Sequence, residues 1–192
     1  LNIITGIILL VSLTGNAGGS KSGFKSKVTE VIERPKTYLQ KIPPNASALV
    51  IVLIGLGIFQ IGTIDYIESS LMLGVRISGL VVFALFSWLQ IKSYKSFGKN
   101  YSTEIVFKKN HELKTDGIYK KIRHPQYISQ ILSDLGAGVA LLSFLVIPFV
   151  LLIELPLYVL RAKKEEELLQ KHLKEEFQNY KKQSGFMLPF IG

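Results

Sequence analysis

The apolar residues of this chain are gathered into blocks about as long as a lipid bilayer is thick. Residues 46–64 and 71–91 each approach the ~20 apolar residues that a helix needs to cross the hydrocarbon core. Residues 1–13 form a shorter apolar block, and residues 127–160 form a longer one. The chain combines 48% hydrophobic residues with 23 basic and 14 acidic side chains, so the two kinds of residue are strongly segregated. This segregation predicts a polytopic integral membrane protein.

The block 127–160 is too long for one membrane span and slightly too short for two. We therefore predict a tight helical hairpin that turns near residues 143–148. Together with one span from each of the other blocks, this gives about five transmembrane helices. Residues 1–13 could instead be a signal peptide, but no basic segment precedes them and no small-residue cleavage site follows. No strand pattern is visible, so the predicted fold class is all-α.

The basic residues predict how the chain is oriented in the membrane. All but one of the 23 Lys and Arg residues fall within residues 19–46, 92–126 and 161–192, whereas the link 65–68 is acidic. Because basic loops stay on the cytoplasmic side, these three segments are predicted to face the cytoplasm. The net charge of +9 then reflects topology and attraction to anionic lipid, and we expect no nucleic-acid partner.

The composition also limits the chemistry. The chain has no cysteine, which excludes disulfides, thiolate catalysis and cysteine-based metal sites. Its three histidines, His111, His124 and His172, do not have the spacing of metal ligands. We therefore expect no bound metal.

A dense motif, residues 117–127, stands where the basic segment meets the fourth apolar block. Pro125 disfavours helix at His124 and suits the first turn of a new helix, so the imidazole is predicted at a helix entrance. The free N–H groups and positive dipole end there favour a carboxylate or phosphate. The alternative is a basic loop that contacts lipid headgroups.

A second segment begins directly after the hairpin. Arg161 and Glu165 are four residues apart, so on a helix they lie on one face. Residues 168–180 continue an amphipathic helix that can fold back over the loop before it. The alternative is a solvated helix start in which the two side chains simply pair.

The two segments together resemble the isoprenylcysteine carboxyl methyltransferases. These enzymes belong to a wider group of integral-membrane methyltransferases that includes phospholipid N-methyltransferases. The likeness covers roughly residues 95–192. The residues that carry it are His111-Glu-Leu-Lys114, Gly117-x-Tyr119, Arg123-His-Pro-x-Tyr127, Arg161, Glu165-Glu166, Leu168, Tyr180 and Leu188-Pro-Phe190. The chain departs from the family at Ser129 and Lys174, where a glycine is common.

This resemblance implies S-adenosylmethionine as the cofactor, bound at the cytoplasmic surface. The positions that it assigns to the cofactor are Glu104, His111, Glu112, Leu113, Lys114, Tyr119, His124, Pro125, Gln126, Tyr127 and Glu165. It places Arg161 toward the substrate. Residues 1–91 would then form three membrane spans with the basic loop 19–46. Residues 92–192 would form the cofactor-binding catalytic part: the loop 92–126, the hairpin 127–160 and the helix 161–192.

These residue types suit methyl transfer to a lipid-linked acceptor in the bilayer. Glu165 can bind the cofactor's ammonium group, and His124 with the helix-entrance N–H groups can hold its carboxylate. Tyr119 or Tyr127 can flank the sulfonium or the base. A carboxylate acceptor such as that of an isoprenylcysteine is already ionised, so it needs a cation such as Arg161 to aim it. An amine acceptor would instead need Glu165 or its neighbour as a base.

Three alternatives stay open. One is a phospholipid amine N-methyltransferase. Another is a membrane reductase that uses NADPH to reduce sterol-like lipids; in that case the basic residues of 108–123 would bind the 2′-phosphate of NADPH. The third is a non-enzymatic lipid-binding protein, for which the intramembrane carboxylates Asp134 and Glu154 should matter. Those two carboxylates could equally pair with Arg76 or with hydroxyl groups of neighbouring helices.

Overall fold

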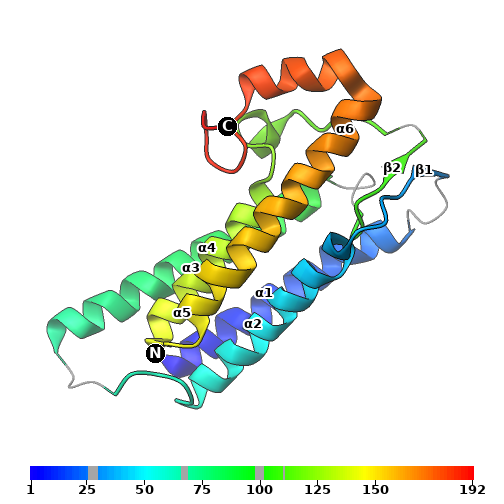
Figure 1. The fold of residues 1–192 in the computed structure, drawn as a ribbon. Helices are drawn as coiled ribbons and strands as arrows, with labels where there is room; N and C mark the ends of the chain where they lie inside the picture. The colour runs from blue at the N-terminus through cyan, green and yellow to red at the C-terminus, as the bar shows by residue number, and fades with distance from the viewer. Residues whose placement is uncertain (26–29, 66–68, 98–101, 110) are drawn as a thin grey trace.

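The computed structural model of the protein describes residues 1–25, 30–65, 69–97, 102–109 and 111–192, and the side chains of 18–25 are outside the description. Long helices run side by side along the molecule (Figure 1). Their bounds are Asn2–Lys25 for α1, Ile42–Ile58 for α2, Ser70–Phe97 for α3, Pro125–Leu141 for α4, Val146–Phe149 for α5 and Leu155–Gln183 for α6. A π-helical segment, η5 (Val150–Glu154), joins α5 to α6. The mainly helical fold agrees with the prediction.

One of these helices meets the length and composition of a membrane span. Within the described residues, α3 alone is both long and apolar enough to cross a bilayer. The apolar part of α1, Asn2–Ala17, and the whole of α2 are apolar but shorter. The predicted number of about five spans therefore stays a prediction.

Helices α3 and α4 pack closely because glycines face each other between them. A Cβ atom added to Gly79 would lie 2.5 Å from the backbone N of Ala140, and one added to Gly136 would lie 2.5 Å from the backbone N of Phe83. Small residues allow helix backbones to approach this closely in membrane proteins. This contact joins the first half of α3 to the last part of α4.

The fourth apolar block reverses direction after α4. Leu142 adopts the left-handed conformation and ends α4, and the chain becomes helical again at Val146. The hydroxyl of Ser143 donates to the carbonyl of Gly62 at 3.0 Å, which ties the reversal to the loop after α2. The four-residue turn 142–145 is short enough to keep the two arms of the block adjacent.

The two buried carboxylates of this block contact hydroxyl and amide groups. Ser47 donates to Glu154 at 2.5 Å and also lies 2.8 Å from the hydroxyl of Tyr158. Gln130 donates to Asp134 at 2.6 Å. Both carboxylates are almost fully buried, so these partners offset part of the cost of their burial.

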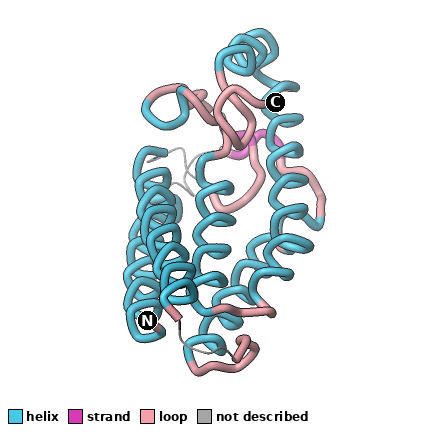
Figure 2. Tube along the Cα trace, turned by 90° about the vertical axis from the view of Figure 1, so that its left-hand side faces the viewer, coloured by secondary structure: helices cyan, strands magenta, loops and turns pink. Residues whose placement is uncertain are grey.

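The expectation that no strand is present is wrong in one place. Strands β1 (Val31–Glu33) and β2 (Phe107–Lys108) form a short antiparallel ribbon at the end of the molecule that also holds the last part of α6 (Figure 2). Strands of two or three residues are too short to show an alternating pattern. They form because the tertiary fold places two segments side by side that are more than 70 residues apart in the sequence.

Candidate functional site

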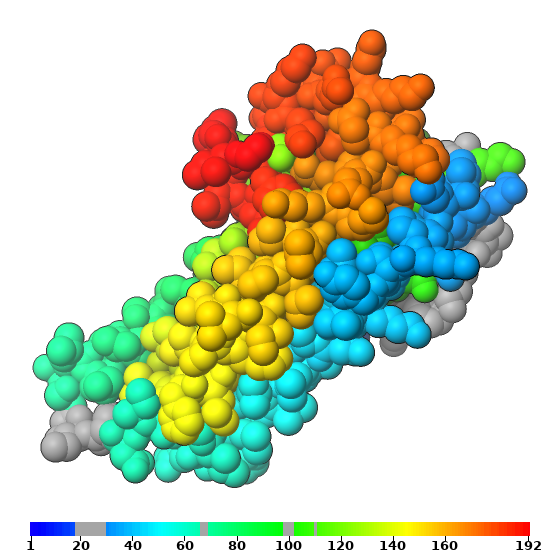
Figure 3. Space-filling view, in the orientation of Figure 1, coloured from blue at the N-terminus to red at the C-terminus, as the bar shows by residue number. Residues whose placement is uncertain are grey.

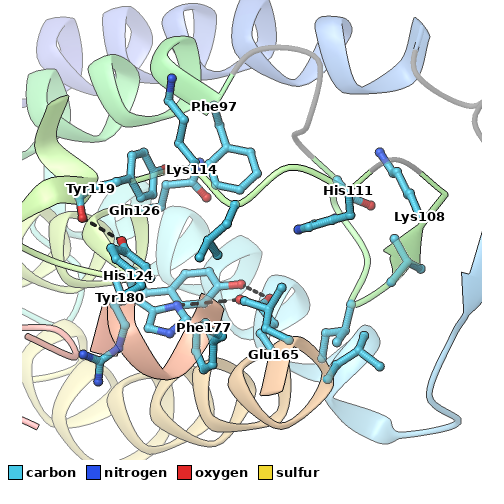
Figure 4. Close-up of a pocket in the computed structure, with 18 of the residues that line it drawn as sticks. Phe97, Lys108, His111, Lys114, Tyr119, His124, Gln126, Glu165, Phe177 and Tyr180 are labelled. Carbon is cyan, nitrogen blue, oxygen red and sulfur yellow. Dashed lines mark hydrogen bonds and ion pairs between the residues drawn. The ribbon is translucent and has the colours of Figure 1, made fainter. Parts of the chain in front are cut away.

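A cavity lies between the loop that precedes α4, the start of α4 and the last part of α6 (Figure 4). Its volume is about 920 Å³, including the space that is open to solvent. The residues that line it are Phe97, Ser102, Glu104, Ile105, Val106, Lys108, His111, Leu113, Lys114, Tyr119, Arg123, His124, Pro125, Gln126, Tyr127, Glu165, Leu168, Leu169, Phe177 and Tyr180. The two segments singled out in the sequence therefore meet in one wall.

The start of α4 is built as its sequence predicts. Pro125 occupies the first turn, and His124 has a non-helical backbone immediately before it. Proline has no N–H, and the next N–H groups of a first turn have no partner inside the helix. The side-chain Nε2 of Gln126 is also buried without a hydrogen-bond partner among the described residues. These donors make the start of α4 suited to hold a carboxylate.

His124 is held between two glutamates of α6. Its Nε2 lies 3.2 Å from Oε1 of Glu166, and its Nδ1 lies 3.7 Å from Oε2 of Glu165. Its ring is nearly parallel to that of Tyr127, with the centroids 5.7 Å apart. The imidazole is only 8% exposed, so its orientation is fixed by these contacts.

Glu165 reaches the cavity wall through contacts with two other predicted site residues. Its Oε1 accepts a hydrogen bond from the hydroxyl of Tyr127 and another from Nε of Arg161 at 3.3 Å. Nε of Arg161 also donates to the Tyr127 hydroxyl at 2.8 Å. The predicted i,i+4 relationship of Arg161 and Glu165 therefore holds, and Tyr127 joins it from α4.

The guanidinium of Arg161 is almost fully buried behind this wall. Its Nη1 donates to the backbone carbonyls of Leu39 at 2.9 Å and Gln40 at 3.3 Å, and its Nη2 donates to that of Thr103 at 2.7 Å. One side chain thus connects α6, the segment before α2 and the loop after α3. Arg161 does not itself line the cavity.

Glu166 does not line the cavity, and it contacts Arg123 and His124, which do. It accepts hydrogen bonds from Nε of Arg123 at 2.6 Å and from His124, and Nζ of Lys181 lies 3.2 Å away. Burial by itself would raise the pKa of Glu166, but the hydrogen bonds from His124 and Arg123 outweigh it and lower this pKa to about 2. Glu166 is therefore ionised at neutral pH and fixes the motif 117–127 to α6.

On another side of the cavity Lys108 and His111 line the wall, and His111 is supported by a stack of rings behind it. His111 stacks on Phe107, which stacks in turn on His172, and His172 lies 2.7 Å from Glu33. Burial, and to a smaller extent the charge of Lys108, lowers the pKa of His111, so its imidazole is neutral at pH 7.

Tyr119 is a buried residue of the cavity wall. Its ring meets that of Phe97 edge to face, with the centroids 5.2 Å apart, and its backbone carbonyl accepts a hydrogen bond from Tyr180 at 2.6 Å. Burial raises the pKa of Tyr119, so its hydroxyl stays protonated.

The predicted cofactor residues are largely brought together. Those that line the cavity are Glu104, His111, Leu113, Lys114, Tyr119, His124, Pro125, Gln126, Tyr127 and Glu165. Glu112, also predicted, is exposed and is not among the lining residues. In the part of the chain that the structure describes, no three His, Asp or Glu side chains lie close enough to hold a metal ion.

Sequence reasoning did not assign Phe97 or Phe177 to the site, and it considered Lys108 only as one of the basic residues that would bind the phosphate of NADPH. Phe177 had a signal, because it lies on the apolar face of the amphipathic helix that was expected to fold back. Phe97 and Lys108 had none, since each is one of several similar residues in its segment.

Comparison with known proteins gives three matches. The chain matches the isoprenylcysteine carboxyl methyltransferase family over residues 70–171. A protein-S-isoprenylcysteine O-methyltransferase of Tribolium castaneum is 29% identical over 115 residues, which cover 59% of this chain and 41% of that protein. A solved structure of the eukaryotic intramembrane Ras methyltransferase, an isoprenylcysteine carboxyl methyltransferase, has a TM-score of 0.56 and 22% identity, over 77% of this chain and 52% of that one.

These matches differ in what they show. The chain spans about half the length, or less, of the two proteins that it matches. The structural likeness, at 22% identity, shows a shared fold. The family match covers more than half of the chain and includes both the motif 117–127 and the Arg161–Glu165 segment. On this ground the chain belongs to the isoprenylcysteine carboxyl methyltransferase family.

Proposed function

We propose that this protein is a membrane-embedded methyltransferase that uses S-adenosylmethionine to methylate a lipid-linked acceptor, and that the acceptor group is the carboxylate of an isoprenylcysteine. The observation that carries this proposal is the meeting of His124, Tyr127 and Glu165 at one cavity wall. Family membership and the name of the Tribolium relative support it.

The cavity residues fit S-adenosylmethionine. Glu165 offers a carboxylate to the ammonium group of the cofactor, and the start of α4 with Gln126 offers donors to its carboxylate. Phe97 and neutral His111 offer aromatic faces to its adenine. When bound, the cofactor supplies an electrophilic methyl group on a sulfonium.

The chain itself contributes binding, orientation and exclusion of water. Tyr127 is held by Arg161 and Glu165, so one wall of the cavity is rigid before any ligand binds. The apolar side chains of Leu168, Leu169 and Phe177 cover another part of the cavity and exclude water there. A carboxylate acceptor is ionised at neutral pH, so no proton has to be removed.

The proposed role of Arg161 is to position this wall. Its guanidinium donates to backbone carbonyls of two separate segments and to Tyr127, and its side chain is 4% exposed. The sequence-based expectation that Arg161 directly receives the acceptor carboxylate stays a prediction.

We further propose that the protein crosses the membrane several times, with the cavity on the cytoplasmic side. The loop before α4 and the part of α6 beyond Arg161 carry most of the basic residues, and both surround the cavity. Basic segments stay in the cytoplasm, and most of the length of α2, α3 and α4 extends away from the end of the molecule that holds the last part of α6 (Figure 1).

Calorimetry with S-adenosylhomocysteine tests the cofactor. We expect saturable binding to the detergent-solubilised protein, and at least tenfold weaker binding to Glu165→Gln because the ammonium group loses its counter-charge. Glu167→Gln is the matched control, since Glu167 is an exposed neighbour that pairs with Lys164. Tight binding of NADPH with no binding of S-adenosylhomocysteine would favour the reductase instead.

A methyl-transfer assay tests the acceptor. Protein in lipid nanodiscs receives methyl-labelled cofactor with either farnesylcysteine or phosphatidylethanolamine. We expect label in farnesylcysteine as a methyl ester, which mild base releases. Base-stable label in phosphatidylethanolamine would identify the amine N-methyltransferase. Binding of cofactor without either product would favour a different acceptor class.

A further inference from the structure

Residues 185–192 form a closed loop beside the cavity, here called the apex loop. Its two ends are joined by a hydrogen bond from the N–H of Phe186 to the carbonyl of Ile191 at 2.7 Å, and the N–H of Ile191 donates to Leu188 at 3.3 Å. Pro189 and Phe190 therefore occupy the two central positions of a tight turn. Figure 3 shows this loop (red) projecting from the surface.

The turn of the apex loop exposes apolar side chains. Phe190 is 84% exposed, Ile191 is 62% exposed and Leu188 is 48% exposed. Phe190 also has a φ of 64°, a left-handed conformation that suits glycine or asparagine and is strained for a bulky aromatic residue. Among the described residues the Phe190 side chain is left largely uncovered at the tip of a strained turn, which points to contact with something outside the protein.

Exposed lysines stand next to these apolar side chains. The N–H of Gly185 donates to the carbonyl of Lys121 at 3.0 Å, so the apex loop lies against the segment that carries Lys120 and Lys121. Both lysines are exposed, as is Lys182 at the end of α6. An apolar tip with basic neighbours is the combination that binds an anionic lipid surface.

The position of the apex loop agrees with such a surface. It contacts residues 121–124, which immediately precede Pro125 at the start of α4. The hydroxyl of Tyr119, in the same segment, donates to the backbone carbonyl of Ser93 near the end of α3 at 3.4 Å. Residues near the end of a membrane helix lie at the level of the lipid headgroups, where aromatic and basic side chains concentrate. The exposed side chains would thus be at the depth at which they can enter the bilayer.

We propose that the apex loop inserts Phe190 and its apolar neighbours into the anionic leaflet and that this contact braces His124. The backbone carbonyl of Gly185 accepts from the N–H of Arg123 at 2.9 Å, and that of Phe186 accepts from the N–H of His124 at 3.1 Å. The ring of Phe186 meets that of His124 edge to face, with centroids 5.1 Å apart. The proposal rests on the membrane placement given under Proposed function, and anionic lipid then stabilises the cavity wall.

Fluorescence quenching tests the insertion without any need for turnover. The single tryptophan is removed by Trp88→Phe, and Phe190→Trp places an indole at the tip of the apex loop. Nanodiscs contain phosphatidylserine and phosphatidylcholine brominated near the top of the acyl chain. We expect the emission to shift to shorter wavelength and to fall to about half of its intensity in unbrominated discs. Gln178→Trp in the same background, on the exposed face of α6, should not be quenched.

Two results would overturn the insertion. An indole at position 190 with the emission of a water-exposed side chain would show that the loop stays in solvent. A blue-shifted emission that brominated lipid does not quench would show that protein covers the tip, as in contact with a second copy. Either result leaves methyl transfer and cofactor binding untouched, so it is distinguishable from failure of the proposed function.

The brace on His124 is tested with Phe190→Asn, which removes the apolar tip while keeping a residue that tolerates positive φ. We expect its affinity for S-adenosylhomocysteine to be about threefold to tenfold lower than that of the unmodified protein in phosphatidylserine discs. In detergent without anionic lipid the two affinities should be equal. Equal affinities in the discs as well would overturn the brace.

Discussion

The side chain of Gln40 pairs with the backbone of Ile105 as if it were a strand. Its Oε1 accepts from the N–H of Ile105 at 2.8 Å, and its Nε2 donates to the carbonyl of Ile105 at 2.9 Å. Ile105 lines the cavity, and the backbone carbonyl of Gln40 accepts from Arg161. A residue of the N-terminal part thus fixes the cavity wall from outside.

Gln40→Leu should therefore weaken cofactor binding although Gln40 does not line the cavity. The substitution leaves two buried backbone groups of Ile105 without partners, which costs about 1–3 kcal/mol. If half of this free energy destabilises the arrangement of the cavity wall that binds the ligand, the affinity for S-adenosylhomocysteine drops about threefold to tenfold. Calorimetry measures the change. Gln178→Leu, at an exposed position of α6, should leave the affinity unchanged, and an unchanged affinity for Gln40→Leu would remove this residue from the wall.

Arg161→Lys separates a positioning role from direct contact with the acceptor. A lysine keeps the charge but cannot reach Leu39, Thr103 and Tyr127 at once. If Arg161 positions the wall, cofactor affinity falls at least tenfold and thermal stability falls with it. If Arg161 meets the acceptor carboxylate directly, cofactor affinity is retained and the KM for the acceptor rises. Calorimetry with S-adenosylhomocysteine and a KM measurement on the same protein decide between the two.

The sequence predicted the elements whose signals are local. Pro125 marks the start of α4, and the spacing of Arg161 and Glu165 places them on one face of α6. The apolar face of the helix after Glu165 predicted that Phe177 and Tyr180 turn toward the loop. The assignment of particular residues to a cofactor came from the family resemblance and not from spacing.

The parts that the sequence could not predict depend on contacts between distant segments. Gln40 and Ile105 are 65 residues apart, and nothing near Gln40 distinguishes it from a solvent-exposed glutamine. Glu165 and Glu166 are adjacent and chemically alike, yet the helix turns about 100° between them. One therefore reaches the cavity, while the other is buried against Arg123. That choice is made by tertiary packing.

Glu166→Gln should destabilise the protein in a way that depends on pH. The lowered pKa of Glu166, about 2 against an ordinary value of 4.5, means that its ionised form stabilises the folded state. This contribution is complete above about pH 4.5 and is lost as the pH falls toward 2. At pH 7 the variant loses hydrogen bonds to a charged group worth about 2 kcal/mol, which lowers the melting temperature by about 4–8 °C.

Thermal melts in detergent between pH 7 and pH 3 check this dependence. The difference between Glu166→Gln and the unmodified protein should narrow below pH 4.5. Glu167→Gln, at an exposed neighbour, should melt as the unmodified protein does at every pH. A difference that stays constant down to pH 3 would mean that Glu166 acts through packing alone.

The α3–α4 contact should tolerate no side chain at Gly79. A Cβ atom there would already lie 2.5 Å from the backbone of Ala140, so Gly79→Leu must force the two helices apart. Overpacking of this kind costs about 1–3 kcal/mol and should lower the melting temperature by several degrees. Gly74→Leu is the same substitution on the same helix, at a position with nothing within 4 Å, and should have little effect. Equal melts for both variants would show that the helices are not in close contact.

The backbone strain at the kink in α6 should be relieved by glycine at position 174, where the family resemblance also places a glycine. Lys174 has a φ of 39° and a ψ of −106°, and the helix changes direction at this point so that Phe177 and Tyr180 cover the cavity (Figure 1). Glycine adopts such a conformation without strain, whereas a lysine pays about 1–3 kcal/mol for it. Lys174→Gly should therefore raise the melting temperature, by about 2–4 °C for each kcal/mol of strain that is relieved. Lys163→Gly, in the straight part of α6, should lower it, because glycine costs about 1 kcal/mol inside a regular helix. If both substitutions lower the melting temperature, the helix is straight at Lys174 and the cavity is closed in some other way.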